Sequence, residues 1–397
     1  MKIEKINFQN LNPLVETMRI VGLGENAHFV QEFNYSRIEL VKYLAPLGFT
    51  HVALEIGAIE ASRINPWLQG DGNENDLLKI AGSLTYGLYR DFLIGLRAFN
   101  RICKRKVHLL GPDLPNNMDV PAEVNGLIAY LEFVDPDSIG LIVTVQEIAS
   151  KISYGSAAIA SQCWANIAIN DQLTLIANLA RMSQRMNIMK PFYVAKSNLH
   201  DWTCAQMHLE AAYNTVHMLC SLSELFSGTG LLADTSIREQ YTATSMLKIL
   251  SSDPSIRILY VAHNNHIQKE PIYFGDHLTA FPTGYYLKHA LDEEYMAIGL
   301  IHSGKNAPEM IMDADHSSVG FRVEMLELDL PPTGSVERLI IKSGFSDQYH
   351  LLDLSFDNSH ELNCIRSQSA FINTPIAKSF DAIWHTPTAT QVENLSF

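Results

Sequence analysis

The chain has 397 residues, of which 47% are hydrophobic and 18% are charged, a balance typical of a globular protein with a substantial core. Its formal net charge of −14 argues against a nucleic-acid backbone or an anionic membrane surface as the main partner, because both require a basic face. Five scattered cysteines without a CxxC motif favour neither a disulfide framework nor a cysteine zinc site, and they suit a reducing compartment.

The N-terminal stretch lacks a hydrophobic signal core. No apolar run approaches the ~18–20 residues that cross a bilayer. We therefore expect a soluble cytoplasmic protein that does not act on membranes.

The first part of the chain alternates between strands and helices. Strands are predicted over 18–24, 50–57 and 107–115, and amphipathic helices over 34–48 and 89–104. This alternation is typical of an α/β fold, with a mostly parallel sheet flanked by helices.

The middle of the chain has a different pattern. From about 121 to 232 the apolar residues follow long helical periods, and "SGTG" at 227–230 marks the exit from this segment. Strand–helix alternation then resumes. We predict one α/β core, formed by 1–120 and 233–397, that carries the functional site. The helical lobe, 121–232, is predicted to be an insertion or cap over the active-site edge of the sheet.

Four of the predicted strands end in chemically reactive residues. Because ligands bind beyond the carboxyl ends of parallel strands, these side chains are expected to converge at one edge of the sheet. Each has an ordinary explanation when taken alone, such as a helix-dipole carboxylate, a core histidine or a turn aspartate. Several strands ending this way are harder to explain by packing, and they predict a catalytic or metal cluster. The residues are Glu25, His28, Glu55, Asp113, His263 and His266.

Two nucleotide-binding patterns are near misses. "GLGENA" at 22–27 matches G-x-G-x-x-A, but Glu25 would place a carboxylate beside the pyrophosphate, and Glu55 comes later than the ~20 residues of the fingerprint. "GLIHSGKN" at 299–306 resembles a phosphate-binding loop, but Asn306 replaces the required Ser or Thr. The chain has no G-x-S-x-G or HExxH motif, so the nucleophile of a hydrolase would be water.

A series of short motifs runs along the chain in a characteristic order. It comprises "GENAH" at 24–28, Arg37, "VALE" at 52–55, "LRAFN" at 96–100, "GPD" at 111–113 and "YVAHNNH" at 260–266. This series resembles the erythromycin esterase family, and segments of the C-terminal half such as 295–307 and 380–391 extend the likeness over nearly the whole chain. The resemblance implies ester hydrolysis, in the best-known members the opening of a macrolide lactone, by water activated at the histidine of G-E-x-x-H.

The resemblance also implies roles for individual residues. His28 would be the general base, and Glu25 would orient it or hold the water. Glu55 and His263 would complete the catalytic cluster. The residues implied to bind the substrate are Arg37, His266 and Asp113.

The chain departs from the family pattern at several positions. Ala27 and Phe29 stand where the family usually has Thr and Gly, and a phenyl ring at that turn is expected to narrow the pocket or shift the base. Glu239 follows Arg238 where the family has Arg-Asp, and tyrosines such as Tyr89 replace an indole. These changes bear on the macrolide substrate more than on the chemistry, so acyl transfer or cyclisation in a natural-product pathway is an alternative.

The expected partner is a small-molecule ester or lactone, and the sequence leaves the oligomeric state open. No cofactor is expected for catalysis by His28. Two alternatives remain. The same histidines and carboxylates can hold a divalent metal such as zinc or manganese, which would then ionise the water. The methionines of the helical lobe also suit a non-catalytic binder of haem or of a hydrophobic small molecule.

Overall fold

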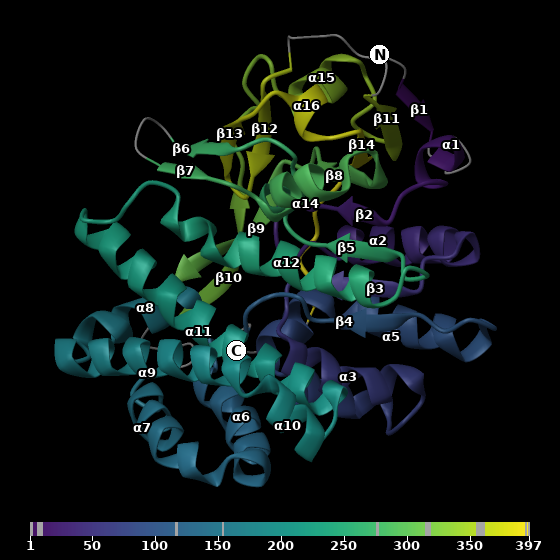
Figure 1. The fold of residues 1–397 in the computed structure, drawn as a ribbon. Helices are drawn as coiled ribbons and strands as arrows, with labels where there is room; N and C mark the ends of the chain where they lie inside the picture. The colour runs from purple at the N-terminus through teal and green to yellow at the C-terminus, as the bar shows by residue number, and fades with distance from the viewer. Residues whose placement is uncertain are drawn as a thin grey trace. The chain divides into compact units, whose positions relative to one another are not determined.

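The computed structural model describes residues 3–5, 11–115, 118–152, 155–274, 278–313, 319–354, 362–393 and 395 (Figure 1). The chain divides into two compact units. The first comprises Met1–Asp113, Glu239–Met312 and Phe321–Phe397, and the second comprises Leu114–Arg238 and Asp313–Gly320. The helical second unit starts seven residues before and ends six residues after the lobe expected at 121–232.

The first unit is built on an eight-stranded sheet of order β1-β11-β14-β8-β2-β5-β3-β4. The six strands from β14 to β4 run parallel to one another, whereas β11 is antiparallel to both of its neighbours, β1 and β14. The expected α/β fold with a mostly parallel sheet is therefore confirmed. The strands are β1 (Ile3–Lys5), β2 (Ile20–Leu23), β3 (His51–Leu54), β4 (His108–Leu110), β5 (Ile258–Val261), β8 (Tyr295–His302), β11 (His350–Asp353) and β14 (Ala382–Thr386).

The centre of this sheet is covered on both faces. Every residue of β2, β5 and β8 is buried, and successive side chains of a strand point to opposite faces. Such burial requires apolar residues at consecutive positions, which is why these strands appear in the sequence as short continuous apolar runs. The helices of this unit are α1 (Asn12–Val15), α2 (Gln31–Leu44), α3 (Ala58–Gln69), α4 (Leu77–Ala81), α5 (Ser83–Ile102), α12 (Ile237–Ser252), α13 (Asn264–Ile267), α14 (Thr283–Leu291), α15 (Val336–Lys342) and α16 (Ile376–Ser379).

Two smaller sheets complete the first unit. β9 (Asn306–Met312) pairs with β10 (Phe321–Glu327), and a four-stranded sheet has the order β12-β13-β6-β7. In that sheet β12 (Cys364–Ser367) and β13 (Ala370–Asn373) form a hairpin, followed by β6 (Ile272–Phe274) and β7 (Leu278–Ala280).

The second unit is helical, with α6 (Val120–Val134), α7 (Ile139–Ala149), α8 (Ala157–Asn166), α9 (Ile169–Ile188), α10 (Lys190–Lys196) and α11 (Leu199–Ser227). Met182 and Met186 are fully buried on α9, which supports core packing as their role. Asp135 binds Arg185 with an Nε–Oδ2 distance of 2.5 Å and also accepts a hydrogen bond from Tyr193. In the part of the chain that the structure describes, no helix is both long and apolar enough to span a bilayer.

Candidate active site

The predicted catalytic residues lie at the carboxyl ends of three adjacent strands. Glu25 and His28 follow β2, Glu55 follows β3, and His263 and His266 follow β5, which lies between them in the sheet. The parallel direction of these strands brings their ends to one edge, as the sequence predicts. Residues separated by more than 200 positions therefore share one site.

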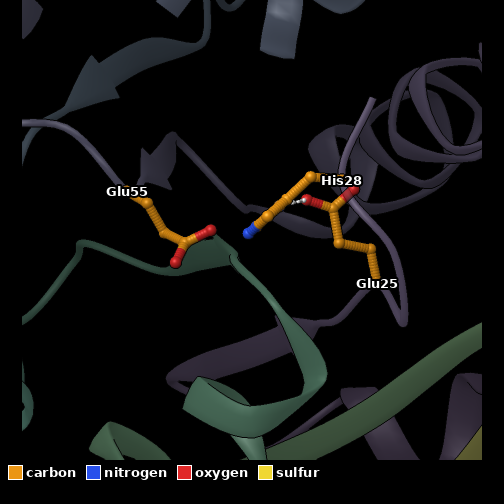
Figure 2. A group of neighbouring side chains, drawn as sticks. All are labelled: Glu25, His28 and Glu55. Carbon is orange, nitrogen blue, oxygen red and sulfur yellow. Dashed lines mark hydrogen bonds and ion pairs between the residues drawn. The ribbon is translucent and has the colours of Figure 1, made fainter. Parts of the chain in front are cut away.

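His28 is oriented by Glu25 and directed toward Glu55. Its Nδ1 lies 2.8 Å from Glu25 Oε1, and Figure 2 shows the other ring nitrogen pointing at the Glu55 carboxylate. The Glu25 side chain is 1% exposed, whereas His28 is 21% exposed. Since an ionised carboxylate only accepts, the His28 proton resides on Nδ1, which leaves Nε2 as the free base.

Opposing effects set the pKa of His28. Burial lowers it, but the hydrogen bond and charge of Glu25, together with the charge of Glu55, outweigh burial and raise the pKa above 6.5. The neutral form needed for a general base is therefore populated as the pH rises through this raised value.

Arg37 lies behind Glu25 and is 1% exposed. Its Nη2 forms an ion pair with Glu25 Oε2, its Nη1 donates to Asn34 Oδ1 at 2.9 Å, and its guanidinium lies 5.0 Å from the centroid of the Tyr89 ring. These contacts belong to a group that fixes Glu25 in place. The substrate-binding role implied for Arg37 stays a prediction, and the geometry favours positioning instead.

His263 is held in one tautomer. The backbone N–H of Asn265 donates to His263 Nδ1 at 3.1 Å, so the ring proton resides on Nε2. His263 Nε2 is buried and has no side-chain hydrogen-bond partner among the described residues, and the ring centroid lies 5.2 Å from that of His28. Burial, followed by the charges of His28 and His266, lowers the pKa of His263 to about 3, so the ring is neutral. A hydrogen bond with the backbone of Asn26 acts in the opposite direction and raises this pKa, but it does not outweigh burial.

His266 has the opposite protonation. Its Nε2 lies 3.0 Å from Glu55 Oε1 and its Nδ1 lies 2.7 Å from Glu239 Oε1. Burial would lower its pKa, but the charges and hydrogen bonds of the two carboxylates raise it to about 10. His266 is therefore an imidazolium at neutral pH that neutralises Glu55.

Glu239 is a member of the site that the sequence prediction omitted. It lies on α12, where its Oε2 accepts hydrogen bonds from Thr283 N at 2.9 Å and Thr283 Oγ1 at 2.8 Å. In the sequence, Glu239 was noted only because the Arg238–Glu239 pair departs from the family pattern. That departure did not indicate that His266 is its partner. Only the tertiary fold places this helix beside His266.

The protonation of His266 predicts how stability depends on pH. Because its pKa rises from 6.5 in the unfolded chain to about 10 in the folded one, its contribution is complete below pH 6.5 and is lost between pH 6.5 and about 10. The Glu239→Gln variant should lose this contribution at lower pH, with a cost of the order of a few kcal/mol at neutral pH. Melting curves from pH 6 to 10 measure both effects; identical profiles for variant and wild type would contradict this.

Asp113 lies at the carboxyl end of β4 and is 3% exposed. Thr242 Oγ1 donates to its Oδ1 at 3.2 Å, and its N–H donates to the carbonyl of Ile56 at 3.2 Å. Its charge raises the pKa of the buried Tyr89, where burial is the largest cause. Asp113 thus belongs to the same polar edge, and its contact with a substrate stays a prediction.

Phe29 adopts a backbone conformation with a positive φ of 61°, which is uncommon for a residue other than glycine. Its ring is 2% exposed and lies 6.1 Å from that of Phe321, centroid to centroid. The ring is also in edge contact with the His28 ring, with 6.3 Å between centroids, so its expected effect on the pocket or on the base stays a prediction.

Three of these side chains form a potential metal site. Glu25, His28 and Glu55 each offer one ligand atom, and the three atoms lie within 4.8 Å of one another (Figure 2). Carboxylates with an imidazole suit zinc or manganese. If His28 bound the metal through Nδ1, it would lose its hydrogen bond to Glu25. If it bound through Nε2, it would lose the lone pair that a general base needs.

The glycines of the dinucleotide-like pattern have a packing explanation. A Cβ at Gly24 would lie 1.8 Å from Asn264 Oδ1. The Asn264 side chain donates through Nδ2 to the carbonyl of Leu300 at 3.0 Å and accepts at Oδ1 from the Leu300 N–H at 3.1 Å. Gly24 thus allows close approach of Asn264. Gly299, the first glycine of the phosphate-loop pattern, lies inside β8.

The site contains imidazoles that bind carboxylates at the carboxyl edge of a mostly parallel sheet, an arrangement that suits a hydrolase. Residues 45–389 match the sequence model of the erythromycin esterase family, so the chain belongs to that family. It is 32% identical to erythromycin esterase type I of Escherichia coli over 383 residues, covering 96% of this chain and 93% of that one. It is 28% identical to erythromycin esterase type II of Escherichia coli over 390 residues, covering 95% and 91%.

Solved structures agree with this assignment. A mutant of the erythromycin esterase EreC in its open conformation matches with a TM-score of 0.94 at 31% identity, covering 100% of both chains. A succinoglycan biosynthesis protein matches with a TM-score of 0.71 at 19% identity, covering 98% of this chain and 96% of that one, and shares the fold.

Proposed function

We propose that this protein is an esterase that hydrolyses an ester or lactone bond of a macrolide-type substrate with water activated by His28. The observation that carries the proposal is the orientation of His28, which binds Glu25 through Nδ1 and directs Nε2 toward Glu55. Membership of the erythromycin esterase family and the names of the two Escherichia coli relatives support the substrate class.

The first step is removal of a proton from water. A water molecule between His28 Nε2 and Glu55 gives its proton to Nε2 as its oxygen attacks the ester carbonyl carbon. Glu25 stabilises the imidazolium that forms, and the ion pair with Arg37 holds this carboxylate in place. Such a base contributes ~10²–10⁴-fold to the rate.

The second step needs a donor for the oxyanion of the tetrahedral intermediate. His263 is neutral, and its Nε2–H is engaged by no carboxylate among the described residues, whereas both nitrogens of His266 are engaged by carboxylates. A well-placed donor of this kind is worth ~2.7–4 kcal/mol. When the intermediate collapses, the bond from carbonyl carbon to alkoxide oxygen breaks, and the His28 imidazolium returns its proton to the leaving alkoxide.

The direct test is an assay of the purified protein with a macrolide lactone and with a simple aryl ester. Mass spectrometry should detect a product heavier than the lactone by one water, with the new carboxylate and hydroxyl in the same molecule. Acyl transfer would instead join the acyl group to an added alcohol or amine. Cyclisation would convert an open-chain ester into a ring with loss of its alcohol.

A metal-dependent hydrolase is the second candidate, because the spacing of Glu25, His28 and Glu55 suits a divalent cation. We expect protein purified without added metal to hold less than stoichiometric zinc or manganese, and a chelator to leave kcat unchanged. Elemental analysis and assays before and after dialysis against chelator measure this. A chelator-sensitive rate that zinc or manganese restores would favour the metal mechanism.

A further inference from the structure

The turn of the β12–β13 hairpin has an unusual residue. Ser367 pairs with Ala370, so Gln368 and Ser369 form a two-residue turn, and Gln368 has a φ of 55°. Two-residue turns of this hand favour Asn or Gly, because other side chains clash in the left-handed region. A glutamine at this position indicates a function for its side chain.

Gln368 holds the segment that carries His28. Its backbone N–H donates to the carbonyl of Asn26 at 2.6 Å, and its side-chain Oε1 accepts from the backbone N–H of His28, also at 2.6 Å. The side-chain amide thus acts as a peptide group and completes a pair of hydrogen bonds on either side of Ala27. His28 is 340 residues away from this partner in sequence.

The other end of the amide is anchored by β9. Gln368 Nε2 donates to Glu309 Oε1 at 3.2 Å and to the carbonyl of Pro308 at 3.4 Å, and Ser369 N donates to Glu309 Oε2 at 2.9 Å. Since a carboxylate only accepts, it fixes the NH₂ group of Gln368 on its own side. Oε1 is therefore presented to His28.

The same hairpin contacts the loop of the second histidine. Asn265 Nδ2 donates to Ser367 Oγ at 3.0 Å, and the N–H of Asn265 donates to His263 Nδ1 at 3.1 Å. Ser367 and Gln368, which are adjacent in sequence, thus contact the two segments that carry His263 and His28. The rings are 5.2 Å apart between centroids.

We propose that Gln368 is a positioning residue for the reaction: its side-chain amide, anchored by Glu309, sets the position from which His28 presents Nε2 to water. This inference depends on the proposed role of His28 as the base. A misplacement of about 1 Å at a reacting group can cost ~10²-fold in rate, so the hydrogen bond matters for turnover more than for folding.

The test is Gln368→Gly. Glycine suits the left-handed conformation and keeps the backbone bond to Asn26, so it removes only the side-chain bonds. We expect kcat to fall about 10- to 100-fold with KM within about twofold and an undiminished melting temperature. The rising limb of the pH profile of kcat should also move to lower pH. A less well fixed segment weakens the hydrogen bond between Glu25 and His28, and this bond raises the pKa of His28.

Asp292→Gly is the matched control. Asp292 is another non-glycine residue with a positive φ, 48°, and it lies just before β8 at the opposite end of the strand from the site. It binds Lys288 at the surface. This replacement should leave kcat and the pH profile unchanged.

A charge exchange separates positioning from a general structural role. Gln368→Glu alone faces Glu309 with a second carboxylate and should lower kcat. Adding Glu309→Gln to that variant restores a donor opposite an acceptor and keeps an oxygen for the His28 N–H. We expect the double variant to recover most of the lost kcat.

The outcomes are distinguishable. If the wild type hydrolyses no ester, the proposed function fails. If the wild type is active and His28→Gln is inactive, while Gln368→Gly keeps full kcat and an unshifted pH profile, the positioning role of Gln368 is wrong. A double variant no better than Gln368→Glu alone would overturn it as well.

Discussion

Replacing His28 by glutamine is expected to lower kcat for ester hydrolysis by ~10²–10⁴-fold, because this residue supplies the base that deprotonates water. Glutamine keeps a polar group near Glu25 but cannot accept and return a proton at neutral pH. The fold should persist, since the His28 ring is partly exposed and the backbone bond to Gln368 does not need an imidazole. Steady-state kinetics and far-ultraviolet circular dichroism measure the two effects.

The matched control for this variant is His289→Gln. His289 is exposed on α14, where its Nδ1 bonds the carbonyl of Tyr285 at 2.8 Å, and it has no place in the site. Its rate should equal that of the wild type. Full turnover by His28→Gln would remove this histidine from the mechanism.

Removing the charge of Glu25 should have the second largest effect. Glu25→Gln keeps the shape of the side chain, but it loses the main interaction that raises the pKa of His28. In the wild type, kcat/KM should rise with pH through a value above 6.5; in the variant this limb should move to lower pH and the plateau should fall by ~10²-fold or more. Rates from pH 5 to 9 measure the shift.

Glu25→Gln also leaves Arg37 as a buried charge without its partner, which costs about 3–5 kcal/mol. The double variant Glu25→Gln, Arg37→Gln removes both charges and keeps the test valid if the single variant unfolds. If kcat/KM of a folded Glu25→Gln variant rises over the same pH range as that of the wild type, Glu25 does not act on His28.

The convergence of the main site residues was predictable from the sequence, because it follows from a general property of parallel sheets. The runs before Glu25, Glu55 and His263 are short and apolar, as strands buried on both faces must be. The order of these strands was not needed to place their ends at one edge. The structure confirms this part of the account.

The roles of the supporting residues were not predictable in the same way. Arg37 matched a family position, but only the rotation of α2 about its axis directs the guanidinium to Glu25 and away from solvent. Glu239 and Gln368 act across 27 and 340 positions of sequence, and neither lies in a local pattern that names its partner. Tertiary packing alone decides such contacts.

Some local features also escaped prediction. Within the segment of long helical periods predicted from about 121 to 232, the chain breaks at Ile167 between α8 and α9, without a glycine or proline to mark the break. The hairpin turn at Gln368 lacks the Asn-Gly type of signal, so the four-stranded sheet that contains β12 and β13 was not foreseen.

The measurement that tests the central claim most directly is a nitrogen-15 NMR titration of the histidine side chains, with single variants to assign the signals. The account predicts that neutral His28 carries its proton on Nδ1 and titrates above 6.5, that His263 stays neutral down to about pH 3 with its proton on Nε2, and that His266 stays charged until about pH 10. A His28 that titrates below 6.5 with its proton on Nε2 would contradict the account, because no free base would then face the water.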